Sequence, residues 1–322
     1  MTFVRIGGIP HHVMAEGAGP VCVLSAGLGM SWFDWDPVVP HLVPYRTVVR
    51  FDRPGHGLSA PAAIPPTAAG EADRIAAVLD ALGHRGPVTV VGHSIAGFHA
   101  EAFARLHPAR TAGLVLLDSS VEEDPRPSRT TAPARLLGAV LCAAGLPAAL
   151  GPTVRNLTVR AGTVRRGTPD ADPGPAPART DLDPARTGPA SAPALVRTAP
   201  TRTDPALVRR VYRTSRVLRG TLLENAHYGA VAAELLALRE DRPLPPGLPV
   251  TVLAAPDGSA RWERRQRALA RRLGARYEAA EPSGHLVMRD RPNAVARAVL
   301  DARSRQEGAW TPGDARDRQG NA

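Results

Sequence analysis

Short apolar runs rich in β-branched residues recur along this chain, and segments with apolar residues at helical spacing separate them. Such runs are typical of strands buried in a parallel sheet, and their alternation with helices predicts helices on both faces of that sheet. The fold class is therefore α/β, with a doubly wound, mostly parallel sheet. The predicted strands are 21–25, 47–51, 87–91, 113–117 and 249–253, with a hairpin at 2–14. The predicted helices between them are 68–82, 95–107, 260–273 and 293–303.

The alternation stops after Asp118, because no strand is predicted between residues 119 and 248. Instead, the spacing of apolar residues there predicts helices. We therefore predict a core formed by 1–118 and 249–303 and an inserted helical cap formed by 119–248.

Three helices are predicted in this cap. One covers 206–218, with Asp204 as its N-cap and Pro205 at its first position. A second covers 222–239, where Thr221 and Glu224 are predicted to form a capping box. The third is an amphipathic helix within the apolar run 136–150, with a hydrophobic surface that touches lipid as the alternative. The run is too short and too interrupted by Gly and Pro to span a membrane.

Two segments have too few apolar side chains to offset the entropy lost on ordering. The segment from about 166 to 205 is dense in Pro, Ala, Thr and Arg, and it is predicted to be a mobile loop within the cap. Residues 304–322 are predicted to be a disordered tail for the same reason.

The strongest local motif places Ser94 between a β-branched strand and a helix, in the sequence Val-Val-Gly-His-Ser-Ile-Ala-Gly of residues 90–97. A nucleophile that projects from a tight strand-to-helix turn needs small neighbours, here Gly92 and Ala96, because the backbone packs closely there. The start of the following helix also directs free N–H groups and the positive end of its dipole toward that turn.

This motif resembles the nucleophile elbow of the α/β-hydrolase family. The family pattern ends in Gly where this chain has Ala96, and Gly97 follows at once. The resemblance covers roughly residues 20–120 and 245–302 and extends poorly to the cap. It implies an α/β-hydrolase fold with Ser94 as nucleophile, followed along the chain by a catalytic acid and then a catalytic His.

The resemblance also places the acid after a strand and the His after the last strand. Asp257 follows the predicted strand 249–253, and His285 follows a predicted edge strand at 276–280. A serine hydroxyl needs such a base, and the base needs a group that fixes its tautomer. Ser94, Asp257 and His285 are therefore the predicted catalytic triad.

Asp118 is the second choice for the acid, because it too ends a predicted strand and occupies the acid position of some related enzymes. Asp257 is preferred for its spacing to His285 and for its Pro-Asp-Gly turn. Asp118 is instead expected to accept hydrogen bonds from backbone N–H groups in the turn into Ser119 and Ser120.

The segment Ser-Ala-Gly-Leu-Gly at 25–29 follows the first buried strand, where related enzymes place part of the oxyanion hole. The resemblance implies that the backbone N–H groups of Leu28 and Ile95 bind the oxyanion. His93 is expected in the wall of the pocket, and Trp32 either lines the acyl pocket or packs in the core. The Gly-rich turn at 51–59, also common in the family, is assigned a scaffold role.

The predicted reaction is hydrolysis of an acyl bond, first of all a carboxylic ester, through an acyl-enzyme intermediate. Thioesters, N-terminal proline amides, lactones and carbon–carbon bonds are attacked by the same groups, and acyl transfer to an alcohol or amine is a further alternative. From another class, a non-catalytic binding protein on the same fold stays open. No metal or cofactor is expected, because no His, Cys and carboxylate cluster has metal-ligand spacing and no phosphate-binding motif is present.

The formal charge of +10 first suggests nucleic acid or a membrane surface as partner. However, the chain has no Lys, its 40 basic residues are scattered Arg, and this pattern is typical of a GC-rich genome. We expect a small-molecule acyl substrate, with neither a nucleic acid partner nor integral membrane association. With no signal peptide at the start and two cysteines that cannot form a disulfide framework, a cytoplasmic protein is expected. The oligomeric state stays open.

Overall fold

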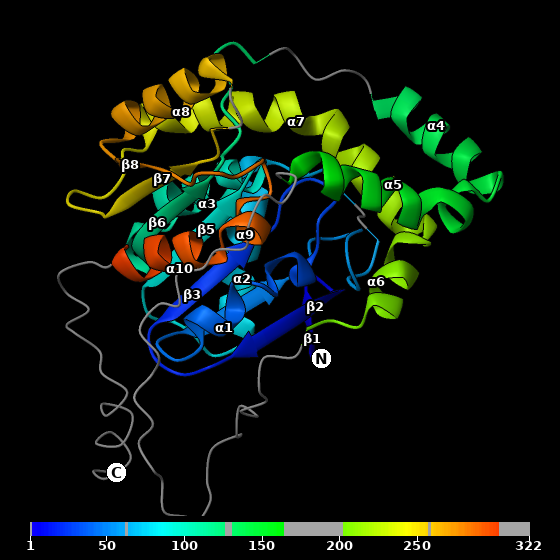
Figure 1. Cartoon of the computed structure of the whole chain (residues 1–322), viewed down its shortest axis with the longest axis horizontal. Helices are drawn as coiled ribbons and strands as arrows, with labels where there is room; N and C mark the ends of the chain where they lie inside the picture. Colours follow the sequence, from blue (N-terminus) through cyan, green and yellow to red (C-terminus); the bar gives the residue numbers. More distant parts are fainter. Residues whose placement is uncertain (1, 62–63, 126–130, 164–201, 257–258, 303–322) are drawn as a thin grey trace, which may run out of the picture.

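The computed structural model describes residues 2–61, 64–125, 131–163, 202–256 and 259–302. Within these residues the chain forms one eight-stranded sheet, flanked by helices on both faces (Figure 1). The strand order is β1-β2-β4-β3-β5-β6-β7-β8. The strands are β1 (Thr2–Ile6), β2 (Ile9–Glu16), β3 (Val21–Ser25), β4 (Thr47–Phe51), β5 (Val88–His93), β6 (Thr111–Leu117), β7 (Val250–Ala254) and β8 (Arg276–Ala279).

The pairing of the strands confirms the predicted doubly wound, mostly parallel sheet. β1 and β2 form the predicted antiparallel hairpin at one edge, and β2 joins β4 antiparallel. All other neighbours, from β4 through β3, β5, β6 and β7 to β8, are parallel. Since the carboxyl ends of parallel strands meet at one edge of a sheet, the residues after β3, β5 and β6 lie near one another.

Alternate residues of the central strands face two separate hydrophobic cores. Val90 and Leu114 pack in the core under α2, α3, α7 and α8. Val91 and Val115 pack on the opposite face, against α1, α9 and α10. The helices are α1 (Val39–Leu42), α2 (Ala68–Ala81), α3 (Ala96–Leu106), α8 (Ala260–Leu273), α9 (Val287–Asp290) and α10 (Pro292–Asp301), with 3-10 turns η1 (Trp32–Trp35) and η2 (Pro108–Arg110).

Between β6 and β7 the described residues form helices only, as predicted, but their boundaries differ from the prediction. These helices are α4 (Thr131–Ala143), α5 (Leu146–Gly162), α6 (Pro205–Tyr212) and α7 (Ser215–Asp241). The predicted Asp204 cap is confirmed, because its carboxylate accepts a hydrogen bond from the Ala206 N–H at 2.7 Å. The apolar run 136–150 belongs to two helices rather than one, since Gly145 adopts a left-handed conformation between α4 and α5.

The predicted capping box of Thr221 and Glu224 is wrong. α7 begins at Ser215, so both residues lie inside the helix. The Thr221 hydroxyl donates to the Val217 carbonyl at 2.9 Å, and Glu224 pairs with Arg53 of the core. The Thr and Glu three residues apart therefore do not mark the start of a helix here. The Glu instead forms an ion pair with a distant part of the chain.

α7 lies wholly within the predicted cap, but part of it packs on the core. Its second half packs on α2 and α3, where Val231, Ala232 and Leu235 belong to the main hydrophobic core. Its first half lies against the loops after β3 and β4, where Glu224 binds Arg53, and packs on α4, α5 and α6. The packing boundary thus lies within α7, before the sequence-based border at Leu248.

No single described helix has the length and hydropathy needed to cross a membrane. The segments Arg135–Ala143 and Leu146–Gly162 meet the criterion only as a pair, and the pair is bent by 109°. Cys22 and Cys142 are both free, as expected. Most of the predicted mobile loop and all of the predicted tail lie outside the described residues. Of the loop, 202–204 are described and lead into α6, which begins at Pro205.

Candidate active site

Ser94 occupies the sharp turn between β5 and α3. Its φ of 56° lies in the left-handed region, which a residue with a side chain adopts only when its surroundings hold it there. The Ser94 N–H donates to the Leu117 carbonyl at 3.1 Å. Its carbonyl accepts from the N–H groups of Gly97 at 2.9 Å and Ser120 at 3.0 Å. Bonds to β6 and to the segment after it therefore hold the turn in this conformation.

The small residues around Ser94 are required by close packing. A Cβ at Gly92 would overlap the Ala96 carbonyl, and a Cβ at Gly97 would overlap the hydroxyl of Ser119. Ala96 itself is fully buried. These contacts explain why the turn has glycine and alanine on both sides of the serine.

His285 lies in the loop between β8 and α9, and its side chain is 44% exposed. Its Nδ1 donates to the Asp118 Oδ2 at 2.6 Å. Since a carboxylate only accepts, this bond requires the proton on Nδ1 and leaves Nε2 as the acceptor of the neutral ring. Asp118 follows β6, which pairs with the Ser94-bearing strand β5. The structure thus brings an oriented imidazole to the edge of the sheet where Ser94 lies.

The partner of His285 is therefore Asp118, the second choice of the sequence analysis, while Asp257 lies outside the described residues. The expected role of Asp118 in the turn into Ser119 and Ser120 is wrong. Its other oxygen accepts from the Ala255 N–H at 3.0 Å and from the Trp262 Nε1 at 2.7 Å. These two donors fix the carboxylate, which is almost fully buried.

Asp118, like Ser94, has a positive φ, which is 39°. Among the described residues only these two have a positive φ without being glycine. The sequence offered no sign of this conformation. The signal that could have favoured Asp118 is the sheet order, which places β6 beside β5, and this order depends on long-range pairing.

The side chain of His93, expected in the pocket wall, is completely buried, and its ring centroid lies 4.7 Å from that of His285. Its Nε2 donates to the backbone carbonyl of His285 at 2.8 Å. Burial, together with the nearby charges of His285 and Arg53, holds the pKa of His93 well below its ordinary value. A neutral His93 thus supports the loop that carries His285, a role that the sequence analysis missed.

Of the two alternatives for Trp32, the structure shows packing in the interior. Its ring is buried between His12 and Phe33, with ring centroids 4.4 Å and 4.7 Å away. The backbone N–H of Trp32 donates to Asp52 Oδ1 at 3.0 Å. Asp52 also accepts from the Leu58 N–H at 3.0 Å, so the turn at 51–59 has a structural role, as predicted.

The loop after β3 carries Leu28. The Tyr212 hydroxyl of α6 donates to the Gly29 carbonyl at 3.0 Å, and Arg53 donates to the carbonyls of Ala26 and Gly27. Among the described residues, the N–H groups of Leu28 and Ile95 have no hydrogen-bond acceptor. Both are therefore available as donors to a ligand.

The part of the chain that the structure describes contains no group of three His, Cys, Asp or Glu residues that could hold a metal ion. Residues 22–298 match the protein-family model described as the alpha/beta hydrolase family.

The chain belongs to the alpha/beta hydrolase family.

The curated relatives of this alpha/beta hydrolase match only part of the chain. The protein named "Putative carbamate hydrolase RutD" from Caulobacter sp. (strain K31) is 35% identical over 127 residues, which cover 38% of this chain and 47% of the relative. Lipase LipV from Mycobacterium tuberculosis is 40% identical over 115 residues, 35% of this chain and 43% of the lipase. The 2-hydroxy-6-oxo-2,4-heptadienoate hydrolase of Pseudomonas putida is 35% identical over 118 residues, 35% of this chain and 42% of that enzyme. The matches thus span less than half the length of these relatives.

Solved structures agree with the family fold over nearly the whole chain. The enol-lactonase from Burkholderia xenovorans LB400 superposes with a TM-score of 0.60 at 20% identity, covering 93% of this chain and 98% of the lactonase. Cfl2 from Burkholderia cenocepacia superposes with a TM-score of 0.64 at 19% identity, covering 93% and 94%. At such low identity these similarities establish the fold alone, and they confirm the predicted fold class.

Proposed function

We propose that this family member is a serine hydrolase that cleaves an acyl bond of a small molecule, first of all a carboxylic ester. The observation that carries the proposal is the 2.6 Å hydrogen bond between His285 Nδ1 and Asp118, beside the strand that ends at Ser94. An imidazole held in this tautomer presents its free Nε2 as a base. In the proposal Asp118 takes the role that the sequence analysis gave to Asp257.

In the first step the Ser94 hydroxyl attacks the substrate carbonyl carbon, and its proton passes to His285 Nε2. Asp118 stabilises the imidazolium that forms. The developing oxyanion is bound by the N–H groups of Leu28 and Ile95, the second of which stands at the start of α3. His285 then protonates the leaving alcohol.

In the second step water attacks the acyl-enzyme ester, with His285 again as base, and releases the acid product. Thioesterase, proline iminopeptidase-like, carbon–carbon hydrolase and acyltransferase activities use the same residues and differ in the bond cleaved or in the acceptor. The names of the partial relatives, a lipase and a carbon–carbon hydrolase among them, support hydrolysis without favouring one bond.

The proposal is tested with a fluorophosphonate probe. Ser94 should displace fluoride from phosphorus and form a stable adduct, because an activated serine beside two N–H donors attacks such probes. Mass spectrometry of a digest should locate the adduct on Ser94. A panel of 4-nitrophenyl esters with acyl chains of graded length then gives kcat and KM.

The matched control is Ser94→Ala, which should lose labelling and lose turnover by about 10⁴-fold or more, because the members of such a triad act as a unit. An adduct on another residue would contradict the mechanism. A folded protein that takes no probe would instead support a binding protein on the same fold.

A further inference from the structure

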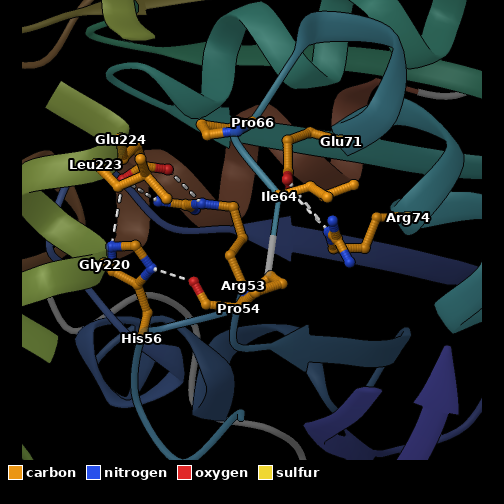
Figure 2. Close-up of a pocket in the computed structure, with 10 residues that line it drawn as sticks. All are labelled: Arg53, Pro54, His56, Ile64, Pro66, Glu71, Arg74, Gly220, Leu223 and Glu224. Atoms are coloured by element: carbon orange, nitrogen blue, oxygen red, sulfur yellow. Dashed lines mark hydrogen bonds and ion pairs between the residues drawn. The ribbon is translucent and has the colours of Figure 1, made fainter. Parts of the chain in front are cut away.

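A buried ion pair joins the cap to the core at Glu224 and Arg53 (Figure 2). The Arg53 Nε donates to Glu224 Oε1 at 2.7 Å, and its Nη2 donates to Oε2 at 3.0 Å. Both side chains are almost fully buried, at 4% exposure or less. Parallel hydrogen bonds of this kind fix the plane of the guanidinium as well as its position.

The rest of the guanidinium faces the loop after β3. Nη2 also donates to the Gly27 carbonyl at 2.9 Å, and Nη1 donates to the Ala26 carbonyl. The Met30 N–H donates to the same Gly27 oxygen at 3.1 Å, so that oxygen has two donors. Arg53 therefore connects the α7 carboxylate to two consecutive carbonyls of the loop.

The Gly27 carbonyl and the Leu28 N–H belong to one peptide group. In a planar trans peptide these two bonds point in opposite directions, so a carbonyl held on one side directs the N–H to the other. A donor on the carbonyl also polarises the peptide and strengthens its N–H as a donor. The orientation of the Leu28 N–H, one of the two donors in the proposed oxyanion hole, thus depends on the position of the Arg53 guanidinium.

Glu224 keeps that guanidinium in place, since a buried charge without a partner moves toward water or reorganises its surroundings. His56 Nε2 lies 3.3 Å from Glu224 Oε2 on the other side of the carboxylate. Burial alone would raise the pKa of Glu224, but the Arg53 and His56 charges outweigh it and hold that pKa well below its usual range. Glu224 is therefore an anion at every pH where such an enzyme works.

α7 approaches the core closely enough for this pair because Gly220 has no side chain. A Cβ at Gly220 would lie 2.8 Å from the Gly55 carbonyl oxygen. One helical turn further along α7, Glu224 meets Arg53, which comes two residues before Gly55. The close contact and the ion pair thus act on the same turn of α7.

We propose that Glu224 is a positioning residue of the reaction, which holds Arg53 so that the Gly27–Leu28 peptide presents its N–H to the oxyanion. Docking of the cap helix α7 and assembly of the oxyanion hole are then a single event. The inference rests on the proposed serine hydrolase function for its kinetic consequence, and on the geometry alone for the orientation of the peptide.

The test compares Glu224→Gln with Glu234→Gln. Both residues lie on α7 and both bind the core, but Glu234 accepts from the N–H groups of Ala68 and Ala69 at the start of α2, at 2.6 Å and 3.0 Å. Glu224→Gln should lower kcat about 10- to 100-fold with KM within about threefold, because an oxyanion donor acts mainly in the transition state. Glu234→Gln should leave kcat within about twofold.

A second readout is independent of activity. The measurement is the NMR amide spectrum of protein labelled on leucine, in which the Leu28 resonance is the one missing from Leu28→Val. This resonance should shift in Glu224→Gln and stay in place in Glu234→Gln. Circular dichroism and thermal melts identify which variants are folded. If Glu224→Gln impairs folding, Arg53→Gln and the double variant give the same comparison, and the double variant should lose no more kcat than Arg53→Gln alone.

The outcomes separate the two proposals. A folded Glu224→Gln variant with the wild-type Leu28 resonance and wild-type kcat overturns the positioning role, while Ser94 labelling keeps the hydrolase proposal. A wild-type protein without labelling or esterase activity overturns the hydrolase proposal. In that case a shifted Leu28 resonance in Glu224→Gln still supports the orientation of the peptide by Glu224.

Discussion

Asp118 follows β6 directly, and three donors converge on its carboxylate: His285 Nδ1, the Ala255 N–H and Trp262 Nε1. In Asp118→Asn the amide oxygen can still accept from two of these donors, but its NH₂ faces Nδ1 and favours the wrong tautomer of the ring. We expect Asp118→Asn to keep its fold and to lose turnover by on the order of 10³- to 10⁴-fold.

The matched variant is Asp257→Asn, which should keep turnover within about tenfold, a barrier change of about 1.4 kcal/mol. The measurement is kcat on one ester for both variants, with thermal melts to establish folding. If Asp257→Asn were the crippled enzyme and Asp118→Asn nearly normal, the acid would be Asp257, as the spacing along the sequence first indicated.

His99, on α3, is fully buried, and neither of its ring nitrogens has a partner among the described residues. Burial lowers the pKa of His99 from 6.5 to about 4. The unfolded chain thus takes up a proton near pH 6.5 that the folded protein takes up only near pH 4. His99 therefore leaves stability intact above pH 6.5 and removes about 3 kcal/mol as the pH falls to 4.

His99→Phe removes this titration and the two unsatisfied nitrogens while keeping a ring of similar shape. We expect its Tm at pH 7 to equal or exceed that of the wild type, and its Tm to fall less steeply between pH 6.5 and pH 4. Thermal melts across this range measure the difference. Parallel curves for the two proteins would mean that His99 does not titrate in this window.

At the scale of elements, the turn from β5 into α3 is tightly packed on both sides of Ser94. In Gly92→Ala the added Cβ would meet the backbone carbonyl of Ala96, which cannot move without opening α3. We expect a loss of about 1–3 kcal/mol in the free energy of unfolding and slower labelling of Ser94 by the fluorophosphonate.

The control is Gly86→Ala, in the loop before β5, where an added Cβ meets no atom within 4 Å and φ is not positive. It should change the free energy of unfolding by less than about 0.5 kcal/mol. Denaturant titrations measure the free energy of unfolding of both variants. Equal stabilities would show that the β5–α3 turn tolerates a side chain close to Ser94.

The elements themselves were predictable where local pattern and tertiary packing agree. The strand pattern located the five central strands, and the helices α2, α3, α8 and α10 follow their predicted ranges within two residues. The failures lie in the cap, where Thr221 and Glu224 carry the pattern of a helix start inside the continuous helix α7. Local sequence could not reveal that the Glu224 carboxylate is bound by Arg53, 171 residues earlier in the chain.

At the scale of the whole molecule, the motif for Ser94 and the position of His285 needed only the order of strands along the chain. The choice of the carboxylate that binds His285 needed the order of strands in space. β6 lies between β5 and β7, so Asp118, which follows β6, lies beside the Ser94 turn and also beside the loop after β7. That neighbourhood depends on pairings between distant segments, such as Leu114 with Val250, which no local pattern encodes.

α7 has 27 residues, or about 40 Å of helix, and serves the cap at one end and the sheet at the other. A chimera that exchanged residues 119–248 as one cassette would remove Val231, Ala232 and Leu235 from the main core and leave Arg53 without its carboxylate. An exchange limited to α4 and α5 leaves the core residues of α7 and the Arg53–Glu224 ion pair in place. An exchange of cap segments with a relative is therefore expected to fold only when α7 stays with the sheet.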